Sequence, residues 1–418
     1  MNRITPLHTV ILTTFAQISK VVSGFLLLKM LAYYLGSAGL GMLGNFMSLV
    51  AITFMLGGGG IVNGIIKHVA EYKLKPKRVI SFIETSAIYT LIFALSFLLI
   101  SIIFSVKISK YIFGDTQYYW IVILLGFAQM GFGFANLVVG VVNGYRDTVT
   151  YAKLQVFGNI IALPLVYALL KKYGVIGASL GIIVFYFSYT LPAYYYYFKS
   201  PFRNYIFRLR LNLPDSKRLF SYTTMLLVSA LAFPVVEIII RLKLISASGF
   251  SDAGLWQGAI RLSGAYLGFF SVFFAYYLTP IISPEQDKKV IRRTVFFFLT
   301  CTASVYAVGA STFYFLRQFL IPLLLSKEFS ALNEVIVFQL IGDFFRILSY
   351  VMGFVAVAKA ATKLYIVSEV LQSIGFLSLS IFFSQYTTPL QGVFFGYLMT
   401  YVIYFILSFF VFLRWSDV

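Results

Sequence analysis

Residues 335–358 read VIVFQLIGDFFRILSYVMGFVAVA, and this stretch decides the class of fold. A helix needs about 20 predominantly apolar residues to cross a bilayer, so we predict a transmembrane helix, which we place at 330–358. Asp343 and Arg346 nevertheless lie near its middle. A charge that faces lipid at this depth costs about 2.5–3.5 kcal/mol. Both side chains are therefore expected to face a polar interior.

The rest of the chain has the same apolar character. Of its 418 residues, 60% are hydrophobic and only 11% are charged, and the mean hydropathy is +0.89. We therefore expect an all-α integral membrane protein with about twelve transmembrane helices. The predicted spans are 7–35, 39–68, 81–106, 117–143, 150–171, 175–198, 216–246, 253–282, 291–316, 330–358, 362–383 and 388–413.

The basic residues are unevenly distributed between the two sides of the membrane. If the N-terminus is cytoplasmic, 21 of the 33 lysines and arginines fall in cytoplasmic segments and six in the opposite loops. This asymmetry follows the positive-inside rule and predicts a multi-pass protein with both termini in the cytoplasm. The net charge of +19 is then mostly a topology signal, and we expect no nucleic-acid partner.

A basic linker at 199–216 is predicted to separate an N-terminal lobe (1–198) from a C-terminal lobe (217–418), with six helices in each. An even number of crossings returns the chain to the same side, so two six-helix repeats would be parallel. The triplet Ala-Gly-Leu at 38–40 recurs at 253–255 and supports this division. Two related bundles around a cleft are the architecture of many secondary transporters.

Signatures of enzymes and of bound cofactors are missing from the sequence. It contains no G-x-x-x-x-G-K-[ST] phosphate loop, no G-x-S-x-G elbow and no H-E-x-x-H motif. The two histidines have no companions at ligand spacing, so we expect neither a metal nor a cofactor. The sequence thus favours a secondary transporter over an enzyme.

Three intramembrane basic residues have no acidic residue one helical turn away on their own span. Lys20 lies near the middle of the first span, too deep to reach the membrane surface, and is expected to line a cavity. Lys29 is nine residues further on and so on the opposite helix face; it either lines the cavity or reaches the nearby surface. Arg261, with Gln257 one turn before it, suits an anionic, sugar-bearing ligand, or else pairs with an acid on another helix.

The acidic groups could act in coupling or only in packing. Asp343 and Arg346 share a helix face at i, i+3; either they neutralise each other, or Arg346 meets an anionic ligand while Asp343 binds a coupling ion. Glu369 is a second candidate coupling site, with a structural hydrogen bond as the alternative. Glu237 and Arg241, at i, i+4, are predicted to form a simple charge pair.

Four consecutive glycines, residues 57–60, interrupt the second predicted span. Each weakens a helix by roughly 1 kcal/mol relative to alanine. They permit close helix packing or a hinge. Asn63, just beyond them, could satisfy the freed backbone groups or contact a ligand.

Six segments of the chain are distinctive. They are AGLGMLGNF at 38–46, NGIIKHVAEY at 63–72, GYRD at 144–147, GLWQG at 254–258, FQLIGDFFRI at 338–347 and AKAATKLYIVSEVLQ at 358–372, of which GLWQG and the last are the most specific. These segments resemble the Wzx-type polysaccharide flippases, whose superfamily also contains the multidrug and toxin extruders. The likeness runs along essentially the whole chain and is greatest to the O-antigen and enterobacterial common antigen translocases.

This resemblance implies a bacterial inner-membrane protein that moves an undecaprenyl-diphosphate-linked oligosaccharide from the cytoplasmic to the periplasmic leaflet. It implies two six-helix lobes around a cation-lined cavity, with a polysaccharide polymerase and a chain-length regulator as further partners. Charged positions of the family are similar to Lys20, Lys29, Arg241, Asp343 and Glu369 in this sequence. Glu237 and Arg261 lie outside that pattern.

Two other functions compete with a flippase. An organic-cation exporter of the same superfamily would prefer an acidic cavity, whereas the deep charges of this chain are mostly basic. A membrane glycosyltransferase or polysaccharide polymerase would need a large loop that carries catalytic residues, and no loop of that size is present. The identity of the glycan and the coupling ion, whether a proton, sodium or none, stay open.

Overall fold

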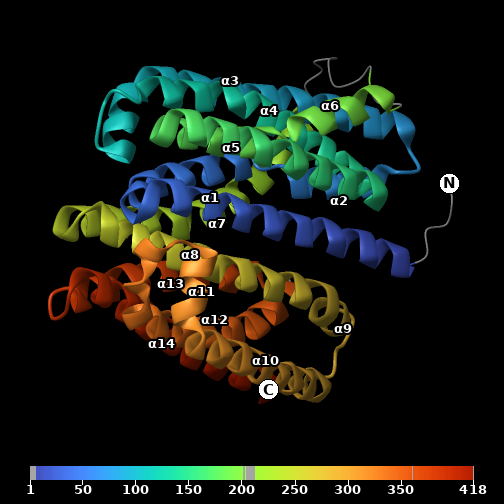
Figure 1. The fold of residues 1–418 in the computed structure, drawn as a ribbon. Coiled ribbons are helices and arrows are strands. Elements are labelled where there is room, and N and C mark those ends of the chain that lie inside the picture. The colour runs from blue at the N-terminus through green and yellow to red at the C-terminus, as the bar shows by residue number, and fades with distance from the viewer. Residues whose placement is uncertain (1–5, 201–202, 204–211, 360, 418) are drawn as a thin grey trace. The chain divides into compact units, whose positions relative to one another are not determined.

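The computed structural model describes residues 6–200, 203, 212–359 and 361–417, and these residues are helical without a β-strand (Figure 1). The prediction of an all-α protein is thereby confirmed. In chain order the elements are α1 (Pro6–Met55), α2 (Val62–Tyr72), α3 (Pro76–Phe113), α4 (Tyr119–Gly144), α5 (Thr148–Phe187), α6 (Thr190–Lys199), α7 (Leu213–Ser248), α8 (Phe250–Phe273), the π-helical turn η1 (Phe274–Leu278), α9 (Thr279–Ile282), α10 (Lys288–Phe315), α11 (Arg317–Leu324), the short 3₁₀ turn η2 (Lys327–Phe329), α12 (Leu332–Ala358), α13 (Thr362–Phe383) and α14 (Pro389–Asp417).

The two longest helices are each interrupted by a glycine in a conformation that other residues rarely adopt. Gly36 in α1 has φ 65° and Gly174 in α5 has φ 53°. Across the bend at Gly174 the chain folds back on itself, and the hydroxyl of Tyr189, just beyond α5, donates a 2.6 Å hydrogen bond to Asn159. The arms also approach closely at Gly177, where an added Cβ would lie 1.9 Å from the carbonyl oxygen of Leu169.

The bends account for the number of membrane crossings. Within the described residues, nine helical stretches are long and apolar enough to cross a membrane. Two of them, Thr14–Met55 and Thr148–Lys199, contain the glycine bends and are each long enough for two crossings. The 36-residue helix α7 is long enough for one more.

By its internal contacts the chain divides into two units, residues 1–34 with 45–231 and residues 35–44 with 232–418. Helix α7 thus begins in the first unit and continues in the second. The predicted division at a linker over 199–216 stays a prediction, because 201–202 and 204–211, including Arg208 and Arg210, lie outside the described residues.

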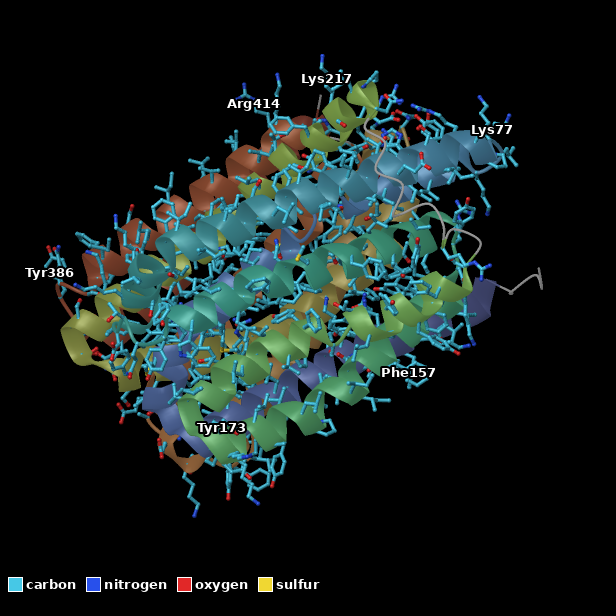
Figure 2. The ribbon with its side chains drawn as sticks, turned by 90° about the horizontal axis from the view of Figure 1, so that it is seen from above. Lys77, Phe157, Tyr173, Lys217, Tyr386 and Arg414 are labelled. Carbon is cyan, nitrogen blue, oxygen red and sulfur yellow. The ribbon has the colours of Figure 1, made fainter. Side chains whose placement is uncertain are left out.

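In the first unit, α3 runs along α4, and α2, α5 and α6 also pack on α4 (Figure 1). Its core contains Ile65, Phe82, Val138, Ala193 and Leu219, all buried. Lys77 lies at one end of these helices and Tyr173 at the other (Figure 2).

In the second unit, α12 is central, with α14, α10 and α8 packed against it and α13 packed on α14. The buried core includes Phe274, Val295, Ile347 and Val351. Burial of such side chains stabilises a fold by roughly 25 cal/mol per Å² of apolar surface removed from water. A helix surface that moves from lipid into the protein gains little of this free energy, so close packing and hydrogen bonds hold the helices together.

The tetraglycine segment separates α1 from α2 in a non-helical turn. Gly58, Gly59 and Gly60 have φ of 71°, 83° and 68°. The freed carbonyls are satisfied from neighbouring helices, since Asn136 Nδ2 donates to Gly57 O at 3.2 Å and Thr223 Oγ1 donates to Gly59 O at 2.6 Å. These two side chains do what the sequence suggested for Asn63, whose own side chain is exposed.

Candidate functional site

A fully buried carboxylate, Asp343 on α12, is surrounded by hydroxyl groups in the second unit. It accepts hydrogen bonds from Ser263 Oγ at 2.6 Å, from Tyr397 OH at 2.5 Å and from Tyr266 OH. Gln339, one turn earlier on α12, donates to Ser263 Oγ at 3.0 Å. Hydrogen bonds of this kind offset the cost of burying a polar group away from water.

The neighbouring glycine explains how Tyr397 reaches the carboxylate. A Cβ added at Gly342 would lie 2.6 Å from the ring of Tyr397, so only glycine leaves room for this approach of α14 to α12. The sequence therefore places a glycine, an aspartate and a tyrosine where α14 packs closely against α12.

Arg346 lies one turn beyond Asp343 and is surrounded by aromatic rings. Its NH1 donates to Tyr397 OH at 2.9 Å and its Nε to Tyr350 OH at 3.1 Å. Its guanidinium carbon is 4.9 Å from the ring centroids of Phe233 and Tyr401, within the range of cation–π attraction.

Tyr397 connects the two charged groups. Its hydroxyl accepts from Arg346 and donates to Asp343, whereas the described ion pairs of the chain lie elsewhere. Asp343 and Arg346 are thus joined through a neutral hydroxyl rather than paired directly. The guanidinium keeps a full positive charge that is held in place mainly by uncharged groups.

Glu369 on α13 lies on the other side of this arrangement. It is half-buried, lies near Tyr365 and Gln372, and is close enough to Arg346 to interact with its charge. Arg346 therefore lies in the electrostatic range of two carboxylates, one on its own helix and one on α13.

A second cluster in the same unit surrounds Arg241, which is fully buried. Arg241 NH2 donates to Gln257 Oε1 at 2.5 Å, and its guanidinium carbon is 5.4 Å from the ring of Trp256. A Cβ at Gly44 would lie 2.4 Å from Arg241 Nε, so this side chain also depends on a glycine for its space.

Arg241 interacts electrostatically with both Glu237 and Arg261. Arg261 is half-buried, and within the described part of the chain its Nε has no hydrogen-bond partner. Glu237 offsets one of the two positive charges, so the cluster carries one net positive charge and a guanidinium Nε that is available as a donor.

The remaining predicted site residues belong to the first unit. Lys20 on α1 and Asn63 on α2 have exposed side chains, and Lys29 is half-buried. The structure thus groups the predicted residues into the Asp343–Arg346–Glu369 network, the Arg241–Gln257–Arg261 cluster with Glu237, and these three positions.

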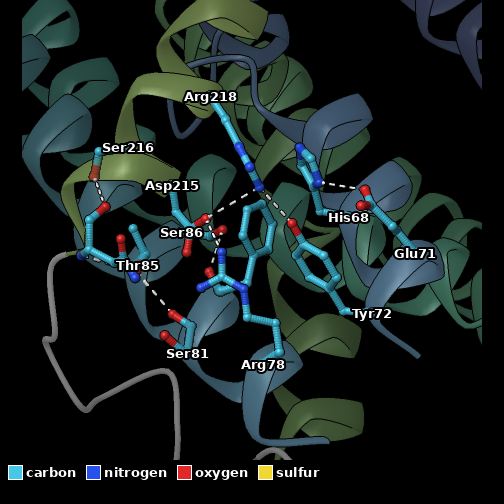
Figure 3. Close-up of polar contacts among 12 residues, drawn as sticks. His68, Glu71, Tyr72, Arg78, Ser81, Thr85, Ser86, Asp215, Ser216 and Arg218 are labelled. Carbon is cyan, nitrogen blue, oxygen red and sulfur yellow. Dashed lines mark hydrogen bonds and ion pairs between the residues drawn. The ribbon is translucent and has the colours of Figure 1, made fainter. Parts of the chain in front are cut away.

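The first unit holds an ionic cluster that the sequence reading treated only as part of the topology signal (Figure 3). Asp215, at the start of α7, is fully buried and accepts a 2.6 Å hydrogen bond from Arg78 on α3. Arg218 lies 3.9 Å from the same carboxylate oxygen and donates to Tyr72 OH at 2.6 Å. The cluster fastens the beginning of α7 to α2 and α3.

Sequence reasoning missed the hydroxyl partners Ser263, Tyr266, Tyr350 and Tyr397. Their helical spacing gives a faint signal, since Ser263 and Tyr266 are at i, i+3. Within the described residues, no group of three or more histidine, cysteine, aspartate or glutamate side chains could hold a metal ion.

Comparison with known proteins gives close matches over the whole length. The chain is 32% identical over 411 residues to the lipid III flippase of Escherichia coli K12 and equally to that of Shigella flexneri, and the match covers 96% of this chain and 97% of each relative. No protein-family model matches the chain.

Several solved structures share the fold. An inward-facing multidrug resistance MATE family transporter of the MOP superfamily has a TM-score of 0.75 at 15% identity, covering 96% of this chain and 94% of that one. The lipid II flippase MurJ, in an inward closed conformation, has a TM-score of 0.71 at 15% identity, covering 97% and 87%. The membrane fold and the resemblance read from the sequence are both confirmed.

Proposed function

The chain belongs to the lipid III flippase family, and we propose that it moves an undecaprenyl-diphosphate-linked oligosaccharide from the cytoplasmic to the periplasmic leaflet. The cargo is an O-antigen unit or the lipid III of enterobacterial common antigen. The observation that carries this function is the 32% identity to named lipid III flippases over 96% of the chain. The protein is accordingly a transporter of a lipid-linked oligosaccharide and not an enzyme.

A lipid-linked diphosphate needs its negative charge compensated while it crosses the membrane. Arg346 suits this task because its charge is supported by hydroxyls and aromatic faces and is not neutralised by a direct ion pair. Cation–π contacts of this kind contribute roughly 0.5–2 kcal/mol each, and a guanidinium binds phosphate oxygens in a bidentate manner.

The other proposed cargo contacts are Lys20, Lys29 and Arg261 for the diphosphate and Asn63 and Gln257 for the glycan. Arg261 is supported by its unpartnered Nε. Gln257 is supported by its place beside Arg241, whose guanidinium donates to its Oε1 at 2.5 Å. Alternating access, in which the cation-lined cavity opens to one side of the membrane at a time, would complete the transfer.

Asp343 and Glu369 are the proposed coupling groups. Both carboxylates lie near Arg346, so a proton or cation taken up by either one would change the electrostatic environment of the cargo contact. Glu237 and Arg241 are proposed to remain a structural charge pair.

We place the protein in the bacterial inner membrane with both termini in the cytoplasm. The positive-inside distribution of its basic residues supports this orientation. A polysaccharide polymerase and a chain-length regulator are the proposed partners, since both would act on the glycan after it has crossed.

Complementation of a flippase-deficient strain tests the proposed contacts. Lys20→Ala, Arg261→Ala and Arg346→Ala should each impair glycan export while the protein still inserts. Lys107→Ala, at an exposed position on α3, is the matched control and should export normally. Full export by all three variants, at equal amounts of protein in the membrane, would contradict the cation-lined cavity.

A further inference from the structure

Helices α12, α13 and α14 of the second unit enclose an apolar groove of about 240 Å³. On α13 it is lined by Leu364, Val367 and Leu371, whose side chains are 47%, 53% and 60% exposed. Leu407 and Val411 line it from α14. Exposed apolar side chains along a groove in a membrane protein face lipid chains rather than water.

The length of the groove matches one leaflet of a bilayer. It extends from Ala361 to Leu371 along α13 and from Tyr404 to Trp415 along α14. At about 1.5 Å per residue each stretch is about 15 Å long, half of the roughly 30 Å hydrocarbon core. A single lipid chain of one leaflet therefore fits along it.

One end of the groove is basic. Lys359, in the turn between α12 and α13, lines it and donates a hydrogen bond to the carbonyl oxygen of Glu285. Trp415 lines it from α14, and Lys288 Nζ lies 5.4 Å from the centroid of a Trp415 ring. Tryptophan and lysine side chains are typical of the headgroup level of a membrane, so this end suits a phosphate.

The other end leads to the cluster around Arg346. Tyr404 and Ser368 line the groove there and lie near each other. Tyr404 interacts electrostatically with Glu369 and Arg346. The groove thus connects a basic headgroup position to the proposed cargo contacts.

We propose that this groove is a loading site for the lipid part of the cargo, with the isoprene units nearest the diphosphate along α13 and α14 and the diphosphate at Lys359 and Lys288. The proposal rests on the proposed function and adds to it the place where the cargo binds before it crosses. An ordinary phospholipid would satisfy the basic end equally well, but the continuity of the groove with the Arg346 cluster favours the cargo.

Two positions allow the groove to be altered with little disturbance of the fold. Gly353 lines it, and a Cβ added there meets no atom within 4 Å, so Gly353→Leu fills the groove. Gly309→Leu on α10 is the matched control, because a Cβ there also meets no atom within 4 Å. Lys359→Ala removes the positive charge, Lys359→Arg retains it, and Lys289→Ala removes an exposed lysine outside the lining.

The test uses the full chain in phosphatidylcholine nanodiscs with undecaprenyl diphosphate as the probe and native mass spectrometry as the readout. Lys359→Ala should weaken binding roughly fivefold, the equivalent of about 1 kcal/mol per lysine near an anionic headgroup. Gly353→Leu should weaken it about tenfold, the equivalent of roughly two buried methylenes. Lys359→Arg and both control variants should bind as the wild type does.

Two results would overturn the loading site: unchanged binding in both Lys359→Ala and Gly353→Leu, or displacement of the probe by an equal amount of phosphatidylglycerol. Binding and transport are measured separately, so the two proposals fail separately. A wild-type protein that binds the probe in the groove but does not flip a lipid-linked oligosaccharide would refute the proposed function and leave the loading site standing. Normal flipping with binding that is insensitive to both variants would refute the loading site alone.

Discussion

Tyr397→Phe removes one oxygen atom from the centre of the network around Asp343. The wild-type hydroxyl accepts from Arg346 at 2.9 Å and donates to Asp343 at 2.5 Å. The ring itself should stay in place, because it packs against Gly342 and lies 5.4 Å from the ring of Phe376. The substitution therefore tests the bridge between the two charges with little change in packing.

The expected loss of stability is about 2 kcal/mol. An average hydrogen bond between transmembrane helices contributes only about 0.6 kcal/mol, whereas one to a charged group contributes roughly 1.5–3 kcal/mol. Tyr397 makes two bonds to charged groups, but Asp343 keeps Ser263 and Tyr266 as partners. We expect the flipping rate to fall about tenfold, which corresponds to a barrier raised by about 1.4 kcal/mol.

The assay combines denaturant unfolding of the purified protein in detergent with flipping in proteoliposomes. Tyr386→Phe is the control, because Tyr386 lies between α13 and α14, is 72% exposed and stands at the opposite end of α14 from Arg414 (Figure 2). A Tyr397→Phe protein with unchanged stability and an unchanged flipping rate would refute the bridging role.

Three further predictions concern other parts of the molecule. Asp215→Asn should lower the free energy of unfolding by about 2 kcal/mol. This loss is smaller than that from breaking a fully buried ion pair, because Arg78 is 33% exposed. An unchanged thermal midpoint in detergent would contradict the role of this cluster in attaching α7 to α2 and α3. Gly60→Ala should reduce the amount of folded protein, because Gly60 has φ 68° and a new Cβ would lie 2.5 Å from Leu226. Gly114→Ala should reduce it less, because Gly114 has a similar φ of 77° but open space around it. Equal amounts of the two variants on a size-exclusion column would show that packing at Gly60 is unimportant. Asp343→Asn should make flipping insensitive to a pH gradient, and a response that persists would assign coupling to another group.

Most of the fold could be predicted from the sequence, because length and hydropathy determine membrane spans directly. The boundary between the predicted spans 150–171 and 175–198 falls at the bend at Gly174, and the boundary after residue 35 falls at Gly36. The conformation of the tetraglycine segment could not be predicted, since it depends on Asn136 and Thr223 from distant parts of the chain.

Of the candidate site, only the charged residues could be predicted from the sequence. A charged side chain in an apolar span is costly and therefore conspicuous, which drew attention to Asp343, Arg346 and Glu369. Tyrosine and serine cost little free energy in such spans, so Tyr397 could not be recognised from the sequence as the link between two charged groups. The pairing of Arg78 with Asp215 joins positions 137 residues apart, a contact that local spacing does not encode.

We propose that Arg346 provides the positive charge for a lipid-linked diphosphate, and flipping of a defined lipid-linked oligosaccharide in proteoliposomes measures this role. The wild type should transfer the lipid between leaflets, and Arg346→Gln, reconstituted in equal amount and with an unchanged unfolding profile, should do so at least about tenfold more slowly. Equal rates for the two proteins would contradict the claim.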